Sequence, residues 1–160
     1  MAIFVNENTK VLVQGLTGGQ GKYHGLRNRD YGTQIVAGVT PGKAGQDVDG
    51  IPVYDTVEDA IAATGATASF VVVPPKFAAG AILDAAKAGV EFIVCITEGI
   101  PAQDEAKVYN TLVRDHPNTR LLGPNCPGII SPGKCNIGIT AGEIAQVPSA
   151  DGPNVGIVSR

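Results

Sequence analysis

The sequence has little that would serve a membrane, a nucleic acid or a disulfide framework. No apolar run approaches the roughly 20 residues that a transmembrane helix needs. Its 12 lysines and arginines against 15 acids give a net charge of −3, with no broad basic field for a nucleic acid. Three cysteines, Cys95, Cys126 and Cys135, form neither an even disulfide set nor a CxxC pair. We therefore expect a soluble protein of a reducing compartment, the cytoplasm or an organelle after import, that binds neither membranes nor nucleic acids.

Tryptophan is absent, whereas glycine (21 residues) and proline (11 residues) are frequent, so tight turns should separate many short elements. The amino terminus turns polar at Asn6, too early for a secretory signal peptide. A length of 160 residues suits one domain that can bury a core.

Short apolar strand patterns alternate with helical patterns along the chain. We expect strands at 10–14, 34–39, 51–54, 68–73 and 92–96 and from 120, and helices at 21–31, 56–64 and 76–88 and from Pro101. Thr56 and Asp59 resemble a capping box at the second helix. Residues 123–142 are expected to form an irregular connection. Strands without polar alternation predict an α/β, Rossmann-like, doubly wound fold: a mostly parallel sheet with helices on both faces.

Loops rich in glycine and proline follow five of the expected strands. In a doubly wound sheet these loops share the carboxyl edge, where ligands bind. They are residues 15–21, 40–45, 74–75, 97–101 and 123–128. We therefore expect one extended binding site along this edge.

The loop Gly15-Leu-Thr-Gly-Gly-Gln-Gly21 joins the first strand to the first helix. Its glycines let the backbone approach an anion, helix N–H groups point toward it, and Thr17 and Gln20 add side-chain donors. The spacing is not G-x-G-x-x-G, so the usual dinucleotide fingerprint is not met. The alternative is a tight turn that binds nothing.

The tip of the second expected strand lacks the acid that accepts a hydrogen bond from the ribose of NAD. It carries Lys43 instead, which favours a phosphorylated ribose. NADP, with a 2′-phosphate, and coenzyme A (CoA), with a 3′-phosphate, both meet that description. An ordinary solvated lysine is the alternative.

Four strings together resemble a known family. They are Gly38-Val-Thr-Pro-Gly-Lys-Ala-Gly45, Ile96-Thr-Glu-Gly-Ile-Pro101, Gly123-Pro-Asn-Cys-Pro-Gly128 and Val155-Gly-Ile-Val-Ser-Arg160. With the glycine loop, the chain from residue 9 onward resembles the succinate–CoA ligase alpha subunit. The resemblance implies a CoA-binding domain, a beta subunit that binds the nucleotide, and a dicarboxylate substrate.

The resemblance also implies which residues lie at the cofactor. The implied CoA-binding residues are Thr17, Gly18, Gly19, Gln20, Lys43, Val73, Ile96, Thr97, Glu98 and Asn125. It implies no catalytic residue and no metal ligand within these 160 residues, because the histidine that relays the phosphoryl group in the family belongs to a second domain. Residues 1–150 are then the CoA-binding domain, and residues 151–160 begin the second, truncated domain of a longer chain.

Several of these residues have structural alternatives. Glu98 could cap the helix that begins near Pro101, and Asn125 could be a turn residue. Cys126 has no activating neighbour in the sequence, so a structural role is favoured over a nucleophile. His24 and His116 fit surface or capping positions. A stand-alone CoA-binding module, a related malate, acetate or citrate ligase and, last, an NADP-dependent oxidoreductase remain as alternative functions.

Overall fold

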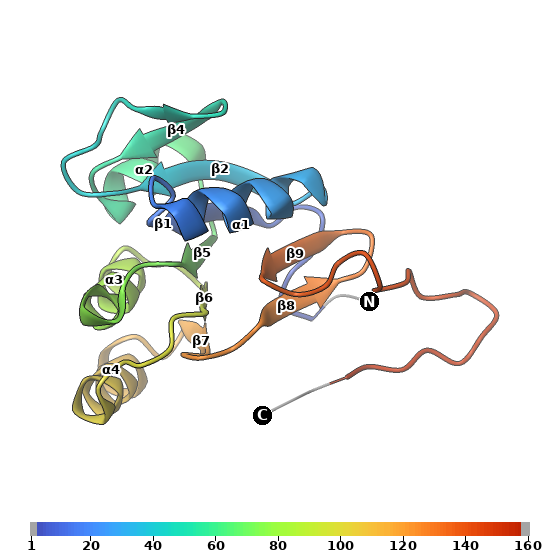
Figure 1. Cartoon of the computed structure of the whole chain (residues 1–160). Helices are drawn as coiled ribbons and strands as arrows, with labels where there is room; N and C mark the ends of the chain where they lie inside the picture. Colours follow the sequence, from blue (N-terminus) through green and yellow to red (C-terminus); the bar gives the residue numbers. More distant parts are fainter. Residues whose placement is uncertain (1–2, 158–160) are drawn as a thin grey trace.

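The computed structural model describes residues 3–157 and places one seven-stranded sheet between two layers (Figure 1). The spatial order of its strands is β3-β4-β2-β1-β5-β6-β7. Every neighbouring pair is parallel except β3 and β4. The strands are β1 (Lys10–Gln14), β2 (Gln34–Val39), β3 (Asp47–Val48), β4 (Ile51–Tyr54), β5 (Ala68–Val71), β6 (Phe92–Cys95) and β7 (Arg120–Leu122). The order turns back at β1, as in a doubly wound fold, which confirms the predicted class.

The two faces of the sheet are covered differently (Figure 1). One face carries α2 (Val57–Thr64), α3 (Pro75–Lys87) and α4 (Ala102–Asp115), whose side chains join one buried cluster. The other face carries α1 (Gly19–Asp30) and a hairpin of β8 (Gly128–Ser131) and β9 (Cys135–Gly138). Helices thus cover both faces, and a hairpin completes the second layer.

The central strands are mostly apolar because both of their faces are covered; Gln14 and Ser69 are buried polar exceptions. All four residues of β5 and all four of β6 are buried. Burying a valine, leucine or phenylalanine side chain stabilises the fold by about 1.5–3 kcal/mol. Small residues such as Ala78 and Ala85 let α3 lie close to this sheet, and Pro75 occupies its first turn.

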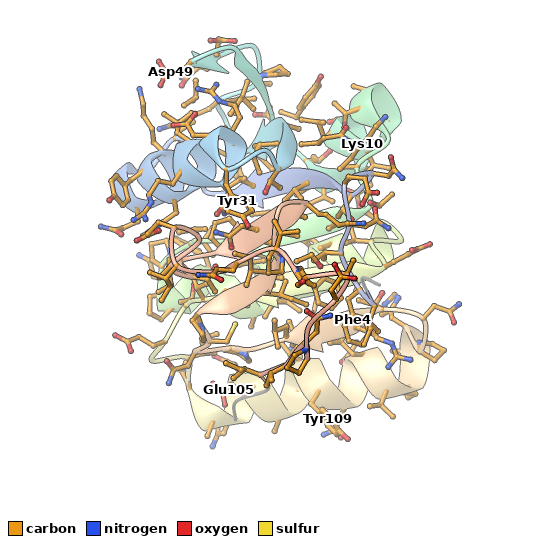
Figure 2. All side chains as sticks on the ribbon, turned by 90° about the vertical axis from the view of Figure 1, so that its right-hand side faces the viewer. Phe4, Lys10, Tyr31, Asp49, Glu105 and Tyr109 are labelled. Carbon is orange, nitrogen blue, oxygen red and sulfur yellow. The ribbon has the colours of Figure 1, made fainter. Side chains whose placement is uncertain are left out.

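The apolar side chains of α4 are only partly buried. Val108 and Leu112 point into the core, whereas Tyr109 is 67% and Val113 60% exposed. In Figure 2 the Tyr109 side chain projects outward from α4.

The expectation that residues 123–142 form an irregular connection is wrong. They contain β8 and β9, which pair antiparallel from Gly128 opposite Gly138 to Ser131 opposite Cys135. A buried contact attaches this hairpin to the rest of the domain: the Thr33 hydroxyl donates to the Asn136 carbonyl at 2.7 Å and accepts from the Asn136 amide at 2.8 Å. Tyr31 lies against the same hairpin (Figure 2), and its hydroxyl accepts from the Gly133 amide at 2.9 Å.

Other element bounds agree with expectation to within a few residues, except that β3 was not foreseen. Of the string 155–160 that carries part of the resemblance, residues 155–157 have no regular structure and the remaining three lie outside the described residues. Within 3–157 no helix is long and apolar enough to cross a membrane. The same residues contain no cluster of three or more potential metal ligands, counting His, Cys, Asp and Glu.

Replacing Thr56 tests the cap of α2. Its hydroxyl accepts from the Asp59 amide at 3.1 Å and donates to the Asp59 carboxylate at 2.7 Å. We expect Thr56→Ala to lower the free energy of unfolding by about 1 kcal/mol, because an amide of the first turn loses its partner. Urea denaturation measures this. Thr56→Ser retains the hydroxyl and should stay within about 0.5 kcal/mol of the wild type; an equal loss in both variants would contradict the capping role.

Candidate cofactor-binding site

The loops that follow β1, β2, β5, β6 and β7 lie along the carboxyl edge of the sheet, since these strands run parallel. The β1 and β5 loops meet at the point where the strand order reverses. A Cβ built on Gly15 would lie 2.7 Å from the Val72 carbonyl oxygen and 3.1 Å from a Val73 methyl group. The glycine loop and the β5 loop are therefore in direct contact, as a continuous site requires.

The glycine loop presents an open helix amino terminus. Gly15 has a φ of +92° and donates to the Val39 carbonyl at 2.9 Å, and Gly18 donates back to Gly15 at 3.0 Å. The N-cap of α1 is Gly18, no side chain caps the helix, and its first turn contains no acid. Backbone N–H groups at this end remain available to an anion, and the helix dipole favours negative charge there.

Lys43 reaches this loop from the end of β2. Its Nζ lies 3.2 Å from the Thr17 Oγ1, and Thr17 Oγ1 donates to the Thr40 Oγ1 at 3.1 Å. The structure thus brings a cation and two hydroxyls to the open end of α1. Thr40 was missed by the sequence analysis, although a hydroxyl directly after a buried strand was a usable signal.

The second half of the predicted set lies on the β5, β6 and β7 loops. The Thr97 hydroxyl donates to the Val73 carbonyl at 2.8 Å, and the Asn125 amide donates to the Thr97 carbonyl at 3.0 Å. Val73, Thr97 and Asn125 are therefore joined to one another. Ile96 and Glu98 flank Thr97, half-buried and exposed respectively.

The structural alternatives for two residues can now be judged. The N-cap of α4 is Pro101 and no side chain caps this helix, so Glu98 does not cap it. Asn125 adopts a φ of +53°, which asparagine tolerates better than most residues, so a turn role is confirmed. That role leaves its side chain available to a ligand.

The two thiols at this edge are those of Cys95, which is buried, and Cys126, which is partly buried. Burial raises the pKa of Cys126, whose Sγ lies 3.4 Å from the Cys95 carbonyl oxygen. Burial also raises the pKa of Cys95, which lies in the core. Protonated thiols are poor nucleophiles at neutral pH, so the structural role of Cys126 is favoured.

Of the two histidines, His116 lies away from the edge that carries the predicted residues, whereas His24 contacts one of those residues. His24 lies one turn into α1, 3.2 Å from Gln20 Oε1, and partial burial and the Arg27 charge lower its pKa. His116 is the C-cap residue of α4, at the opposite end of that helix from the loops. Both positions fit the surface or capping roles.

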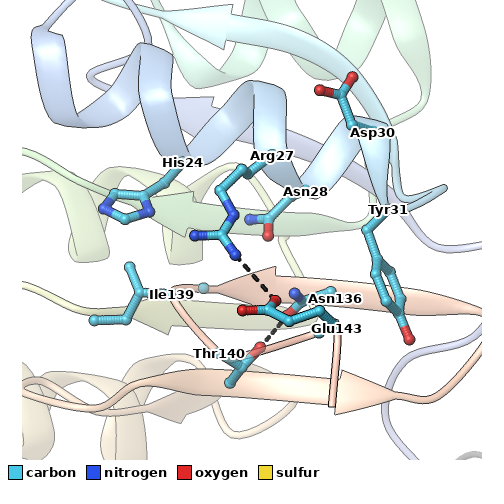
Figure 3. Close-up of a pocket in the computed structure, with 11 residues that line it drawn as sticks. His24, Arg27, Asn28, Asp30, Tyr31, Asn136, Ile139, Thr140 and Glu143 are labelled. Carbon is cyan, nitrogen blue, oxygen red and sulfur yellow. Dashed lines mark hydrogen bonds and ion pairs between the residues drawn. The ribbon is translucent and has the colours of Figure 1, made fainter. Parts of the chain in front are cut away.

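A cavity of about 260 Å³ lies away from these loops, between α1 and β9 (Figure 3). The Arg27 guanidinium crosses it to Glu143 at 3.0 Å. Asn28 contributes a buried amide nitrogen that has no protein partner. None of the predicted cofactor residues lines this cavity, so it is distinct from the carboxyl-edge site.

The doubly wound sheet and the loops along its carboxyl edge together define a nucleotide-binding domain of the Rossmann-like class. Residues 6–99, more than half of the chain, match the family model of the CoA binding domain. The chain belongs to this family, and its cofactor is CoA.

Curated relatives extend the similarity to all 160 residues. The chain is 56% identical to subunit alpha 2 of the ADP-forming succinate–CoA ligase of Archaeoglobus fulgidus and 51% identical to subunit alpha of the Aquifex aeolicus enzyme. It covers 53% and 51% of those proteins, so it spans about half of their length. Among solved structures, ATP citrate lyase of Methanothrix soehngenii in complex with citrate and coenzyme A has a similar fold. The TM-score is 0.72 at 23% identity, over 89% of this chain and 25% of that one.

Two glycines of the first turn allow a matched test of the loop. A Cβ on Gly21 would lie 2.0 Å from the Gly15 carbonyl oxygen, whereas a Cβ on Gly19 meets nothing within 4 Å. We expect Gly21→Ala to lower the free energy of unfolding by at least about 2 kcal/mol, because backbone atoms must move apart. Gly19→Ala should change it by less than about 0.5 kcal/mol. Thermal denaturation of both variants measures this, and similar values would refute the close approach.

Proposed function

We propose that this chain is the CoA-binding part of a succinate–CoA ligase alpha subunit. The reaction joins succinate to CoA at the expense of ATP or GTP and yields succinyl-CoA, ADP or GDP, and phosphate. Identity of 51–56% across the whole chain to alpha subunits of ADP-forming enzymes carries the proposal. The domain division proposed from the sequence, 1–150 and 151–160, accompanies it.

In the proposed site one part of the cofactor contacts the loops after β1 and β2, and the other part contacts the loops after β5, β6 and β7. Thr17, Gly18, Gly19 and Gln20 present donors at the start of α1, where a phosphate would lie. Lys43 supplies the charge for the 3′-phosphate, 3.2 Å from Thr17. The remaining residues, Val73, Ile96, Thr97, Glu98 and Asn125, line the continuation of the edge toward β7. The site is therefore cationic at Lys43 and partly apolar at Val73 and Ile96. Such a surface suits a molecule with phosphates at one end and a pantetheine arm at the other.

The proposal assigns the phosphoryl chemistry to residues outside this chain. His116 lies at the far end of α4, and His24 contacts Gln20 in the first turn of α1; neither histidine and no residue of the edge is proposed as catalytic. A nucleotide-binding beta subunit is the proposed partner, and the cytoplasm the proposed location. The domain's own part is to bind CoA and to hold its thiol at a fixed place beside that partner.

The CoA site is tested by changing Lys43 and the ligand together. We expect Lys43→Ala to weaken CoA binding about 10- to 100-fold, the effect of losing a hydrogen bond to a charged group. Binding of 3′-dephospho-CoA should be equal in both proteins, because the partner of the lysine is missing. Isothermal titration measures all four dissociation constants. Lys10→Ala, at the other end of β1, is the control. Equal losses with both ligands would remove Lys43 from the 3′-phosphate.

The ligase activity is tested on the complete two-subunit enzyme that contains this chain. We expect kcat/KM to be highest with succinate when malate, acetate and citrate are compared, with ADP or GDP release dependent on CoA. The 160-residue chain alone should bind CoA and release no nucleoside diphosphate. Preference for another acid would identify a related acid–CoA ligase, and CoA binding without any ligase activity would favour a stand-alone binding module.

A further inference from the structure

The loop that carries Lys43 is held against the neighbouring strand β4 rather than projecting freely. The Thr40 amide donates to the Tyr54 carbonyl at 2.9 Å, and the Gly45 amide donates to the Val53 carbonyl at 3.0 Å. In return the Val53 amide donates to Gln46 at 2.9 Å. These bonds fix the two ends of the loop. They leave the amides at its tip, where Lys43 lies, to find another acceptor.

That acceptor is Asp55, the residue directly after β4. Its Oδ1 accepts from the Lys43 amide at 2.9 Å and from the Ala44 amide at 2.8 Å. The Lys43 amide also lies 3.1 Å from the Thr40 carbonyl, which closes a turn. Hydrogen bonds to an ionised carboxylate are roughly twice as strong as those between neutral groups. One carboxylate oxygen therefore holds the tip of the loop by two main-chain bonds.

The Asp55 carboxylate binds the backbone amide of Lys43 and not its ammonium group. Within residues 3–157 no ion pair joins Lys43 to an acid, and its Nζ instead lies 3.2 Å from Thr17 Oγ1. If Asp55 bound the ammonium, it would neutralise the charge that an anionic ligand needs. The observed arrangement orders the backbone and directs the side chain toward the glycine loop.

We propose that Asp55 is a positioning residue that sets the preference of this site for a 3′-phosphorylated cofactor by holding Lys43 at the glycine loop. The inference rests on the proposed contact between Lys43 and the 3′-phosphate. In NAD-binding domains an acid at the tip of the second strand accepts from the ribose. Here the acid lies at the end of the neighbouring strand β4, and its oxygen Oδ1 accepts from two backbone amides.

Binding of two ligands to three variants tests the proposal. We expect Asp55→Ala to weaken CoA binding about tenfold and to leave 3′-dephospho-CoA binding unchanged, because part of the charged contact of Lys43 is lost. Asp55→Asn keeps an oxygen acceptor and should remain within about threefold of the wild type. The double variant Lys43→Ala/Asp55→Ala should bind CoA no more weakly than Lys43→Ala, since two residues that act through one contact are not additive.

The matched control is Asp47→Ala. Asp47 also accepts a main-chain hydrogen bond, from Gly50 at 2.7 Å, but in the β3–β4 turn. Its removal should not alter the ratio of the two dissociation constants. A loss of both ligands in Asp55→Ala would overturn the proposal, since it would mean a direct ribose contact or a general loss of structure.

Amide hydrogen exchange of the free chain separates this inference from the proposed function. We expect the Lys43 and Ala44 amides to exchange at least about tenfold faster in Asp55→Ala and at nearly the wild-type rate in Asp55→Asn. Unchanged exchange in Asp55→Ala would overturn the positioning role whatever CoA does. If exchange rises but Lys43→Ala binds CoA normally, the 3′-phosphate contact fails, and with it the effect on cofactor preference, while the loop contact stands.

Discussion

The close approach of the β1–α1 turn to the sheet is the constraint on which the rest of the domain depends. A side chain at Gly21 would overlap the Gly15 carbonyl, and one at Gly38 would lie 2.5 Å from the side chain of Leu16. Leu16 is fully buried between α1 and β2. Because these backbones are in contact, α1 begins directly at the sheet edge, and its free N–H groups point to the place where the other strand-end loops meet. The same contact that builds the core therefore builds the cofactor site.

The site is an edge surface and not an enclosed cavity. Hydrogen bonds between loops give it a defined shape: Thr17 with Thr40 and Lys43, and Val73 with Thr97 and Asn125. Each loop is fixed by its neighbour as much as by its own strand. A long cofactor can lie across such a surface and still meet several fixed groups. The cavity between α1 and β9 is lined by none of the predicted cofactor residues.

Much of the fold could be read from local patterns. The strands near Val11, Phe70 and Val94 are apolar without alternation, and Thr56 marks the start of α2, so period and capping chemistry were enough. The β3–β4 and β8–β9 hairpins were harder to predict from the sequence. The Asp49-Gly50 pair is a strong hairpin signal, but β3 has only two residues and is too short to show a strand pattern. β8 and β9 have four residues each, begin or end with the paired glycines Gly128 and Gly138, and so show too short an apolar pattern to predict a strand.

The sequence by itself determined the class of fold and most of its elements, because hydrophobic period is a local property. Glycine spacing and the missing acid favoured a phosphorylated ribose and left NADP and CoA open, and the family resemblance favoured CoA. Only the tertiary structure decided which side chains share a contact. That the hydroxyl of Thr17 meets Lys43 and that Asp55 holds the Lys43 backbone depends on β4 lying beside β2. Sheet order and register bring together residues that are 26 and 12 positions apart, and no local pattern encodes those distances.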